Sequence, residues 1–277
     1  MSKRFSRARE QPKTRHGGNN LSNFTAFALE GFPLVKSGDN VAKIIVDTAE
    51  KNGLSLQDGD ILVIAQKVFS KAEERVVTLK ETLPSERARE IARIIGKSPR
   101  FVELVLREAK DVLKASQEVL LVRDKRGLIC INAGIDKSNV EGRGNFALLP
   151  ENPDFSARRC RAEIKRLTGR NVAVVICDTY SRPFRRGQVN FAIGLAGINP
   201  FKDYRRKKDL FGQILKVKNI AVVDEIAAAA ELLMGQAQES MPVVIFRGLD
   251  DVVAFCEKCR TIDLSISSEE DLFKGTL

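Results

Sequence analysis

Residues 172–197 read VAVVICDTYSRPFRRGQVNFAIGLAG, two apolar runs separated by a short basic segment. The first run is rich in β-branched residues and has the length of a buried strand. We predict a strand that ends at Asp178, then a short loop, then a second strand. Gly187 and Gly194 are expected to allow backbone segments to approach closely around this loop.

The sequence around this stretch predicts a mixture of helices and strands. Helices are expected over 41–52, 85–96, 98–113, 154–169 and 224–236, and strands over 61–65, 118–123, 128–132 and 242–246, of which 118–132 forms a hairpin. This order is typical of an α/β or α+β protein without a regular βαβ period. GKS at 96–98 lacks the upstream glycine of a P-loop, and no G-x-G-x-x-G motif occurs.

The chain is long enough for one large domain or two lobes, with 277 residues. Its longest apolar stretches are about half the ~20 residues that a membrane helix needs, and no signal segment opens the sequence. We therefore expect a soluble cytoplasmic protein that does not contact membranes.

Five cysteines are spread thinly along the chain, an odd number that does not suit a disulfide-stapled secreted domain. We expect reduced thiols. Cys256 and Cys259 form one CxxC, but a zinc site needs two further ligands at metal spacing. They are interpreted as two structural thiols near a helix end.

A single histidine, His16, lies in the polar N-terminal segment. This excludes a Ser-His-Asp triad, a Cys-His pair and histidine-ligated zinc or iron. Acid, base or metal chemistry must therefore use carboxylates, amides, hydroxyls and lysines, which suit hard cations such as magnesium or manganese.

The net charge is +10, and residues 1–20 hold six basic residues against one glutamate. Such a tail is expected to be disordered and solubilising, although it allows weak contact with nucleic acid. The remaining charge suits a protein that binds polyanionic small molecules. The alternative of a basic nucleic-acid-binding protein stays open, but the sequence has no tryptophan and only two tyrosines.

Asp136 and Asp178 each follow an apolar, strand-like run. Ligands bind outside the carboxyl ends of strands in such sheets, so the two carboxylates are candidates to share divalent metal. Thr179 adds a hydroxyl and Asn139 an amide. Either aspartate alone is more often a turn former or a helix cap.

Arginines follow Asp178 at positions 182, 185 and 186, and Lys71 follows another predicted strand. The guanidinium group of arginine can donate two parallel hydrogen bonds to phosphate oxygens. Phosphoryl transfer requires such cations together with metal ions held by carboxylates. Lys71, Arg182 and Arg185 are therefore candidate catalytic residues. A solvated basic loop is the competing interpretation, as is a plain helix end for 234–240.

Seven segments in order over about residues 30–249 resemble the family of coenzyme F420:L-glutamate ligase. They read GFPLVKSGDN, DGDILVIAQKVFSKAEER, INAGIDKSNV, ICDTYSRPFRRGQVNFAIGLAG, DLFGQIL, VVDEIAAAAELLMGQ and PVVIFRGL. The resemblance implies a two-lobed α+β fold, neither Rossmann nor P-loop, and an intertwined homodimer. We expect a tail over 1–22, a γ-glutamyl ligase domain over 23–250 and a C-terminal extension packed on it over 251–277.

The resemblance also implies which residues bind metal and nucleotide. Asp136 and Asp178 would hold one Mg²⁺ or Mn²⁺ ion, and Thr179 and Gln236 a second, with room for a monovalent cation. GTP would contact Phe32, Pro33, Leu34, Val35, Gln66, Lys67, Lys71, Asn139, Met234, Gly235, Gln236, Ala237, Gln238, Glu239, Ser240 and Met241.

The implied reaction is GTP-dependent addition of L-glutamate to the glutamate-free deazaflavin precursor of coenzyme F420, then of a second, γ-linked glutamate. Some members of the family act on folate instead, which leaves the acceptor open, and a catalytically inactive scaffold is a further alternative. The chain also departs from the family pattern. It has Asn190 where a glycine often follows GQV, Gln66-Lys67 in place of smaller hydroxyl residues, and an unusual loop, MGQAQESMP.

Overall fold

The fold is described by a computed structural model, which covers residues 23–267 and 269–271. Helices are α1 (Val41–Lys51), α2 (Gln66–Ala72), α3 (Glu86–Ile95), α4 (Pro99–Glu108), α5 (Pro153–Thr168) and α6 (Val222–Met234), with 3-10 turns η1 (Leu79–Glu81), η2 (Asn132–Gly134) and η3 (Thr261–Leu264). Strands are β1 (Thr25–Ala28), β2 (Ile61–Ala65), β3 (Val76–Thr78), β4 (Ala109–Ser116), β5 (Val119–Asp124), β6 (Ile129–Ile131), β7 (Asn145–Ala147), β8 (Ala173–Arg182), β9 (Arg185–Ala196), β10 (Lys202–Asp203), β11 (Asn219–Ile220) and β12 (Val243–Arg247). The predicted tail over 1–22 lies outside the described residues.

The central sheet has five strands in the order β1-β12-β2-β8-β9. Among its strands only β2 and β8 pair in parallel, with Ile64 opposite Ile176, and the other neighbours are antiparallel. This mixed sheet is not the parallel, doubly wound sheet of a Rossmann domain. The predicted α+β class is confirmed.

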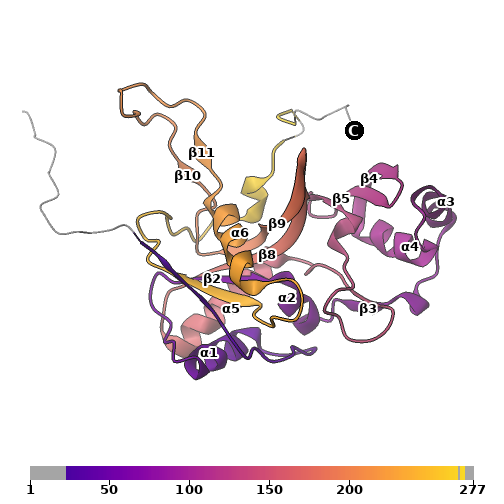
Figure 1. The fold of residues 1–277 in the computed structure, drawn as a ribbon, viewed down its shortest axis with the longest axis horizontal. Helices are drawn as coiled ribbons and strands as arrows, with labels where there is room; N and C mark the ends of the chain where they lie inside the picture. Colours follow the sequence, from indigo (N-terminus) through magenta and orange to yellow (C-terminus); the bar gives the residue numbers. More distant parts are fainter. Residues whose placement is uncertain (1–22, 268, 272–277) are drawn as a thin grey trace, which may run out of the picture.

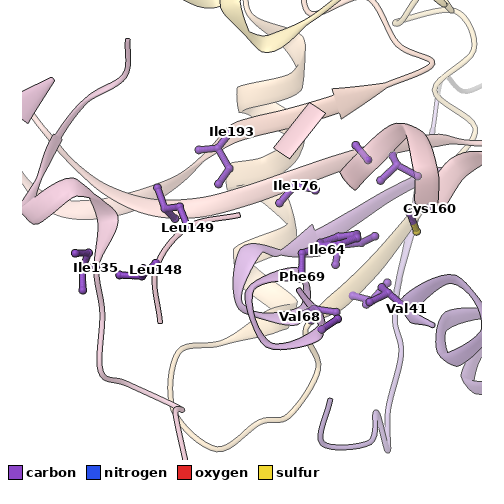
Figure 2. Close-up of a cluster of buried hydrophobic side chains, with 14 of the residues drawn as sticks. Val41, Ile64, Val68, Phe69, Ile135, Leu148, Leu149, Cys160, Ile176 and Ile193 are labelled. Carbon is purple, nitrogen blue, oxygen red and sulfur yellow. The ribbon is translucent and has the colours of Figure 1, made fainter. Parts of the chain in front are cut away.

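Alternate residues of β8 face two separate cores, as the pleat of a strand requires. Val174, Ile176 and Tyr180 join the larger core, to which α1 and α5 contribute. Part of this core is shown in Figure 2, where Ile64 and Ile176 lie near Phe69 of α2. Val175 and Cys177 face the other core, which α6 covers. Both faces of the sheet are therefore buried.

The sheet β4-β5-β6 and helices α3 and α4 gather at one end of the molecule, on the right in Figure 1. The predicted hairpin is confirmed, because β5 and β6 pair antiparallel. The predicted helix over 98–113 is wrong in its last turns, because α4 ends at Glu108 and β4 begins at Ala109. Pairing of β4 with β5 satisfies the backbone of this segment and overrides its helical pattern.

Residues 204–218 connect β10 to β11 as a long projection, which we call the arm; it extends at the upper left of Figure 1. It carries six basic residues and one acid. Four apolar side chains on it are exposed: Leu210, Phe211, Ile214 and Val217.

The close approach predicted for Gly194 is confirmed. A Cβ atom there would lie 2.6 Å from the backbone carbon of Pro153, the first residue of α5. Gly187 is needed for another reason: its φ is +85°, and the nearest atom to an added Cβ would be 3.8 Å away on Arg182. Of these two glycines, only Gly194 brings two backbone segments together.

The expectation of reduced thiols is wrong for Cys256 and Cys259, which form a disulfide. They lie in a coil segment before η3, where the chain bends and places their Cα atoms 5.6 Å apart. Cys130, Cys160 and Cys177 are free and buried, as structural thiols would be. Near the disulfide, Arg161 of α5 donates two hydrogen bonds to Glu257.

A bilayer-spanning helix is absent from the described part of the chain, where no helix combines the required length with sufficient apolarity.

Candidate active site

Strand β8 does not end at Asp178 as predicted, so that both Asp178 and Thr179 lie inside the strand. The strand continues to Arg182 and turns directly into β9, so that Arg182 faces Arg185 and Thr179 faces Asn190. The polar sequence DTYSR stays extended because β9 supplies its backbone partners along the whole length. The expected loop is reduced to a turn at Pro183 and Phe184.

The two residues face opposite sides of the sheet, because they are neighbours on one strand. Asp178 shares its face with Ile176 and Tyr180 of the larger core. Thr179 shares its face with Cys177, on the side that α6 covers. The site therefore has two polar clusters separated by the backbone of β8.

The first cluster surrounds Asp136. Lys67, at the start of α2, places its Nζ atom 2.5 Å from Asp136 Oδ2 and 2.6 Å from the hydroxyl of Ser138. Ser138 also donates to Asp136 from its backbone N–H, at 3.0 Å, and from its hydroxyl. Because β2 leads directly into α2 beside β8, Lys67 is held near Asp178 as well.

The two carboxylates differ in their electrostatic surroundings. Burial alone raises the pKa of Asp136, but hydrogen bonds from Lys67 and Ser138 outweigh it and hold the pKa below its usual value. Burial raises the pKa of Asp178 to about 7, and the charge of Asp136 acts in the same direction. The backbone N–H of Thr179 and the charge of Lys67 only partly oppose this rise.

The second cluster is a continuous hydrogen-bonded chain on the other face of β8. Gln236 donates from Nε2 to the hydroxyl of Thr179 at 2.9 Å and to Glu231 Oε1 at 2.6 Å. Thr179 donates to Asn190 Oδ1 at 2.8 Å, and Asn190 contacts Cys177 Sγ at 3.5 Å. We call Glu231, Gln236, Thr179 and Asn190 the polar chain.

One contact links the segments that carry the two clusters. Asn139 donates from Nδ2 to the backbone oxygen of Gln236 at 3.4 Å. Asn139 lies three residues after Asp136 and has a positive φ of +52°. Gln236 lies in the loop 235–242 between α6 and β12. Segments far apart in sequence therefore meet at residues 178–179.

The remaining residues implied to contact GTP lie on several elements. Phe32 is buried and Leu34 is exposed in the segment between β1 and α1. That segment approaches α2 through Gly38, whose N–H donates to the carbonyl oxygen of Ala72 at 2.9 Å. Gln66 is buried, and its Oε1 lies 2.6 Å from the hydroxyl of Ser70.

Lys71 lies one turn after Lys67 on α2. Burial lowers the pKa of Lys71, and the charge of Lys67 lowers it further, while Glu141 opposes the change. The two lysines therefore form a compact cationic pair. Met234 is buried at the end of α6, whereas residues 236–240 are exposed.

The arginines predicted to handle phosphate lie at the tip of the β8–β9 hairpin. Arg182 is four residues beyond Asp178 along an extended strand, which corresponds to roughly 13 Å. Its Nη2 atom donates to the carbonyl oxygen of Arg186 at 3.1 Å, and Arg185 is exposed. Among the hydrogen bonds of the described residues, none joins these arginines to Asp136, Asp178 or Thr179.

Three residues of the site were not predicted from the sequence: Ser138, Asn190 and Glu231. Ser138 belongs to the quoted segment INAGIDKSNV and could have been found as an Asx-turn partner of Asp136. The sequence distinguishes Asn190 only as a departure from the family pattern. Glu231 carries no sequence signal, since it sits in an ordinary amphipathic helix.

The donors at the site fit a hard divalent cation. Within residues 23–267 and 269–271, no three acidic, cysteine or histidine side chains cluster as metal ligands. Two carboxylates, a hydroxyl and an amide are nevertheless all oxygen donors, and magnesium is commonly held by one or two carboxylates together with substrate phosphates. Asp178 accepts no side-chain hydrogen bond from the described residues, so its buried carboxylate lacks the hydrogen-bonded partner that such groups normally have.

Comparison with known proteins shows the family to which the chain belongs. The model of the family F420-0:Gamma-glutamyl ligase matches residues 31–248. A coenzyme F420:L-glutamate ligase of Archaeoglobus fulgidus is 48% identical over 224 residues, which cover 81% of this chain and 87% of the relative. The protein of the same name from Methanothermobacter thermautotrophicus is 44% identical, covering 79% and 87%.

A third relative, the coenzyme F420:L-glutamate ligase of Methanosarcina mazei, is 42% identical over 255 residues, or 92% of this chain and 96% of the relative. The family match spans Asp136, Asp178, Thr179 and Gln236 together with helix α2. The chain therefore belongs to the F420-0:gamma-glutamyl ligase family.

Proposed function

We propose that this chain is a GTP-dependent ligase that joins L-glutamate to the glutamate-free precursor of coenzyme F420, and then adds a γ-linked glutamate. The observation that carries the proposal is the meeting of three segments at residues 178–179 of β8. Helix α2 brings Lys67, the segment after η2 brings Asp136, and the loop after α6 brings Gln236. These are the segments on which the family resemblance rests.

Asp136 and Asp178 would hold one Mg²⁺ or Mn²⁺ ion, and Thr179 and Gln236 a second. When bound, such ions neutralise triphosphate charge and orient an in-line displacement. The protein's own contribution is to keep these oxygen donors fixed in a partly buried place. Lys67, bound to Asp136, compensates one negative charge in the structure as it stands.

In the first step, a terminal carboxylate oxygen of the acceptor attacks the γ-phosphorus of GTP. The bond from that phosphorus to the β,γ-bridging oxygen breaks, and GDP leaves. The product is an acyl phosphate on the acceptor. Lys67 and Lys71 form a cationic pair on α2 that would stabilise the charge on the transferred phosphoryl group.

In the second step, the amino nitrogen of L-glutamate attacks the acyl carbon. The carbon–oxygen bond to phosphate breaks, inorganic phosphate leaves, and the nitrogen loses a proton to a carboxylate or to water. Arg182 and Arg185, at the tip of the β8–β9 hairpin, would bind the anionic groups of the acceptor or of glutamate. No histidine is needed as a base.

Product analysis tests the proposed reaction. The protein is incubated with the glutamate-free precursor, L-glutamate, manganese and GTP, and the products are analysed by mass spectrometry. We expect one and then two glutamate additions, with one GDP released for each. Parallel reactions contain folate as the acceptor or ATP as the nucleotide. Addition to folate alone, or no addition to either acceptor, would refute the proposed substrate.

We also propose that the chain forms a homodimer through the arm. Contiguous exposed apolar side chains on a soluble protein usually mark an interaction surface, and the arm carries four of them. We expect a dimeric mass at micromolar concentration by light scattering. The double variant L210S/F211S should shift the mass toward that of a monomer, whereas K207S/K208S, on the same arm, should not. A monomeric mass for the unmodified protein would contradict this proposal.

A further inference from the structure

The hydrogen bonds of the polar chain can each run in only one direction. Gln236 Nε2 lies 2.6 Å from a carboxylate oxygen of Glu231. A carboxylate accepts and does not donate, so the amide must present its nitrogen and not its oxygen there. The same nitrogen then donates to Thr179, at 2.9 Å.

The direction propagates to the far end of the chain. Because Thr179 accepts from Gln236, its single hydroxyl proton is available for Asn190 Oδ1, 2.8 Å away. Asn190 is buried and presents its amide nitrogen to Cys177 Sγ, at 3.5 Å. Glu231 is the only charged member of the polar chain, and it therefore decides the orientation of the other three side chains.

We propose that Glu231 is a positioning residue for the active site, which acts through Gln236. Glu231 holds the side-chain amide of Gln236 so that the nitrogen faces Glu231 and Thr179. This leaves Oε1 of Gln236 as the free acceptor of that side chain. Glu231 also fixes the loop 235–242, whose other contacts with the body of the site include the 3.4 Å hydrogen bond from Asn139. The metal part of this inference rests on the proposed function.

The position of Glu231 suits this role. It lies in the last turn of α6, a helix whose other face packs against β9 and β8. Its Oε2 atom is buried and makes no hydrogen bond to any described residue, so the carboxylate is committed to Gln236 through Oε1. Immediately after α6, Gly235 has a φ of +66°, and a Cβ there would collide with the Glu239 carboxylate. The backbone therefore turns sharply directly after the turn of α6 that carries Glu231.

The test compares Glu231→Gln with Glu225→Gln. Glutamine keeps the size of residue 231 but can offer either a donor or an acceptor, so the amide of Gln236 is free to reverse. Glu225 lies on the same helix, is exposed, and undergoes the same change of charge. Hydrogen exchange of the metal-free proteins is followed by mass spectrometry, and Mn²⁺ binding is measured by calorimetry with the metal alone.

We expect Glu231→Gln to speed exchange of the backbone amides of residues 235–240 by about 10-fold, with β2 and β8 unaffected, as for loss of one charge-assisted hydrogen bond. Affinity for Mn²⁺ should fall by about 10-fold, the usual effect of removing a partner that orients a ligand. Glu225→Gln should change neither quantity.

Two results would overturn the inference. One is exchange in 235–240 that is the same in Glu231→Gln and Glu225→Gln. The other is faster exchange throughout the protein, which would show that Glu231 supports the fold in general. If the loop alone loosens but the unmodified protein binds no Mn²⁺, Glu231 positions the loop and the proposed metal-dependent function is wrong. The two failures are therefore distinguishable.

Discussion

Replacing Asp178 with asparagine is expected to abolish glutamate addition while leaving the fold intact. The carboxylate is buried on β8, and no described side chain donates a hydrogen bond to it. Asparagine has the same shape but no charge, so it cannot replace a carboxylate as a ligand of a divalent cation. Removing a residue that only orients a metal ligand lowers metal affinity or activity about 10–100-fold. Removing the ligand itself should therefore lower turnover at least about 100-fold.

Stability should not fall in this variant, because burial raises the pKa of Asp178 to about 7 and the ionised form is therefore unfavourable in the folded protein. Turnover is measured from GDP release, and folding from the thermal midpoint. Asp47→Asn on α1 is the matched control, since the Asp47 side chain is 46% exposed and pairs only with Lys43 among the described residues. Near-normal turnover in Asp178→Asn would show that this carboxylate does not hold the metal.

The elements that the sequence predicts correctly are those in which the local pattern and the tertiary structure agree. Helix α5 is capped at its C-terminus by Gly169, and α3 by Gly96, each in the left-handed conformation that favours glycine. The errors lie where a neighbouring strand decides the outcome. Residues 109–113 continue a helical pattern but pair with β5, and 178–182 look like a loop but pair with β9.

The candidate site shows the same division. Asp136, Asp178, Thr179 and Gln236 could be selected from the sequence because the family resemblance supplies them in order. Asn190 could not be selected, because its contact with Thr179 depends on the register of β8 with β9. Once Asp178 is known to lie within a strand, the alternation of side chains along that strand places Asp178 and Thr179 on opposite faces of β8.

Replacing Arg247 with methionine is expected to have the largest effect on stability among the substitutions considered. Arg247 ends β12 and donates from Nε and Nη2 to the two carboxylate oxygens of Asp60, at 2.8 Å each. Asp60 is fully buried, whereas the Arg247 side chain is 26% exposed. The hydrogen bond to Asp60 raises the pKa of Arg247 even though burial opposes it.

Asp60 also ties the start of β2 to β8, because its carbonyl oxygen accepts from the N–H of Ala173 at 2.8 Å. Methionine fills much of the space of arginine but leaves this carboxylate buried without its cation. Breaking a buried pair in this way costs about 3–5 kcal/mol. For a chain of this size, we expect the thermal midpoint to fall by roughly 10 °C. Urea unfolding gives the change in free energy.

The control is Arg205→Met, because Arg205 makes an equally bidentate pair with Asp203, at 2.9 Å from Nε and 2.7 Å from Nη2. Both members of that pair are about half exposed, with side-chain exposures of 52% and 46%. Exposed pairs contribute at most about 1 kcal/mol, so this variant should be nearly as stable as the unmodified protein. Equal losses in the two variants would show that burial of Asp60 is not the source of the effect.

A second substitution distinguishes loss of the attraction between Arg247 and Asp60 from the cost of leaving Asp60 charged, buried and unpaired. If the cost of Arg247→Met comes from leaving Asp60 buried and unpaired, then adding Asp60→Leu should restore part of the stability, because two apolar groups can replace a buried ion pair. The pair lies at the opposite end of β2 from Gln66 and Lys67. Turnover at low temperature should therefore stay normal in Arg247→Met. Substitutions at one end of β2 then change stability, and substitutions at the other end change activity.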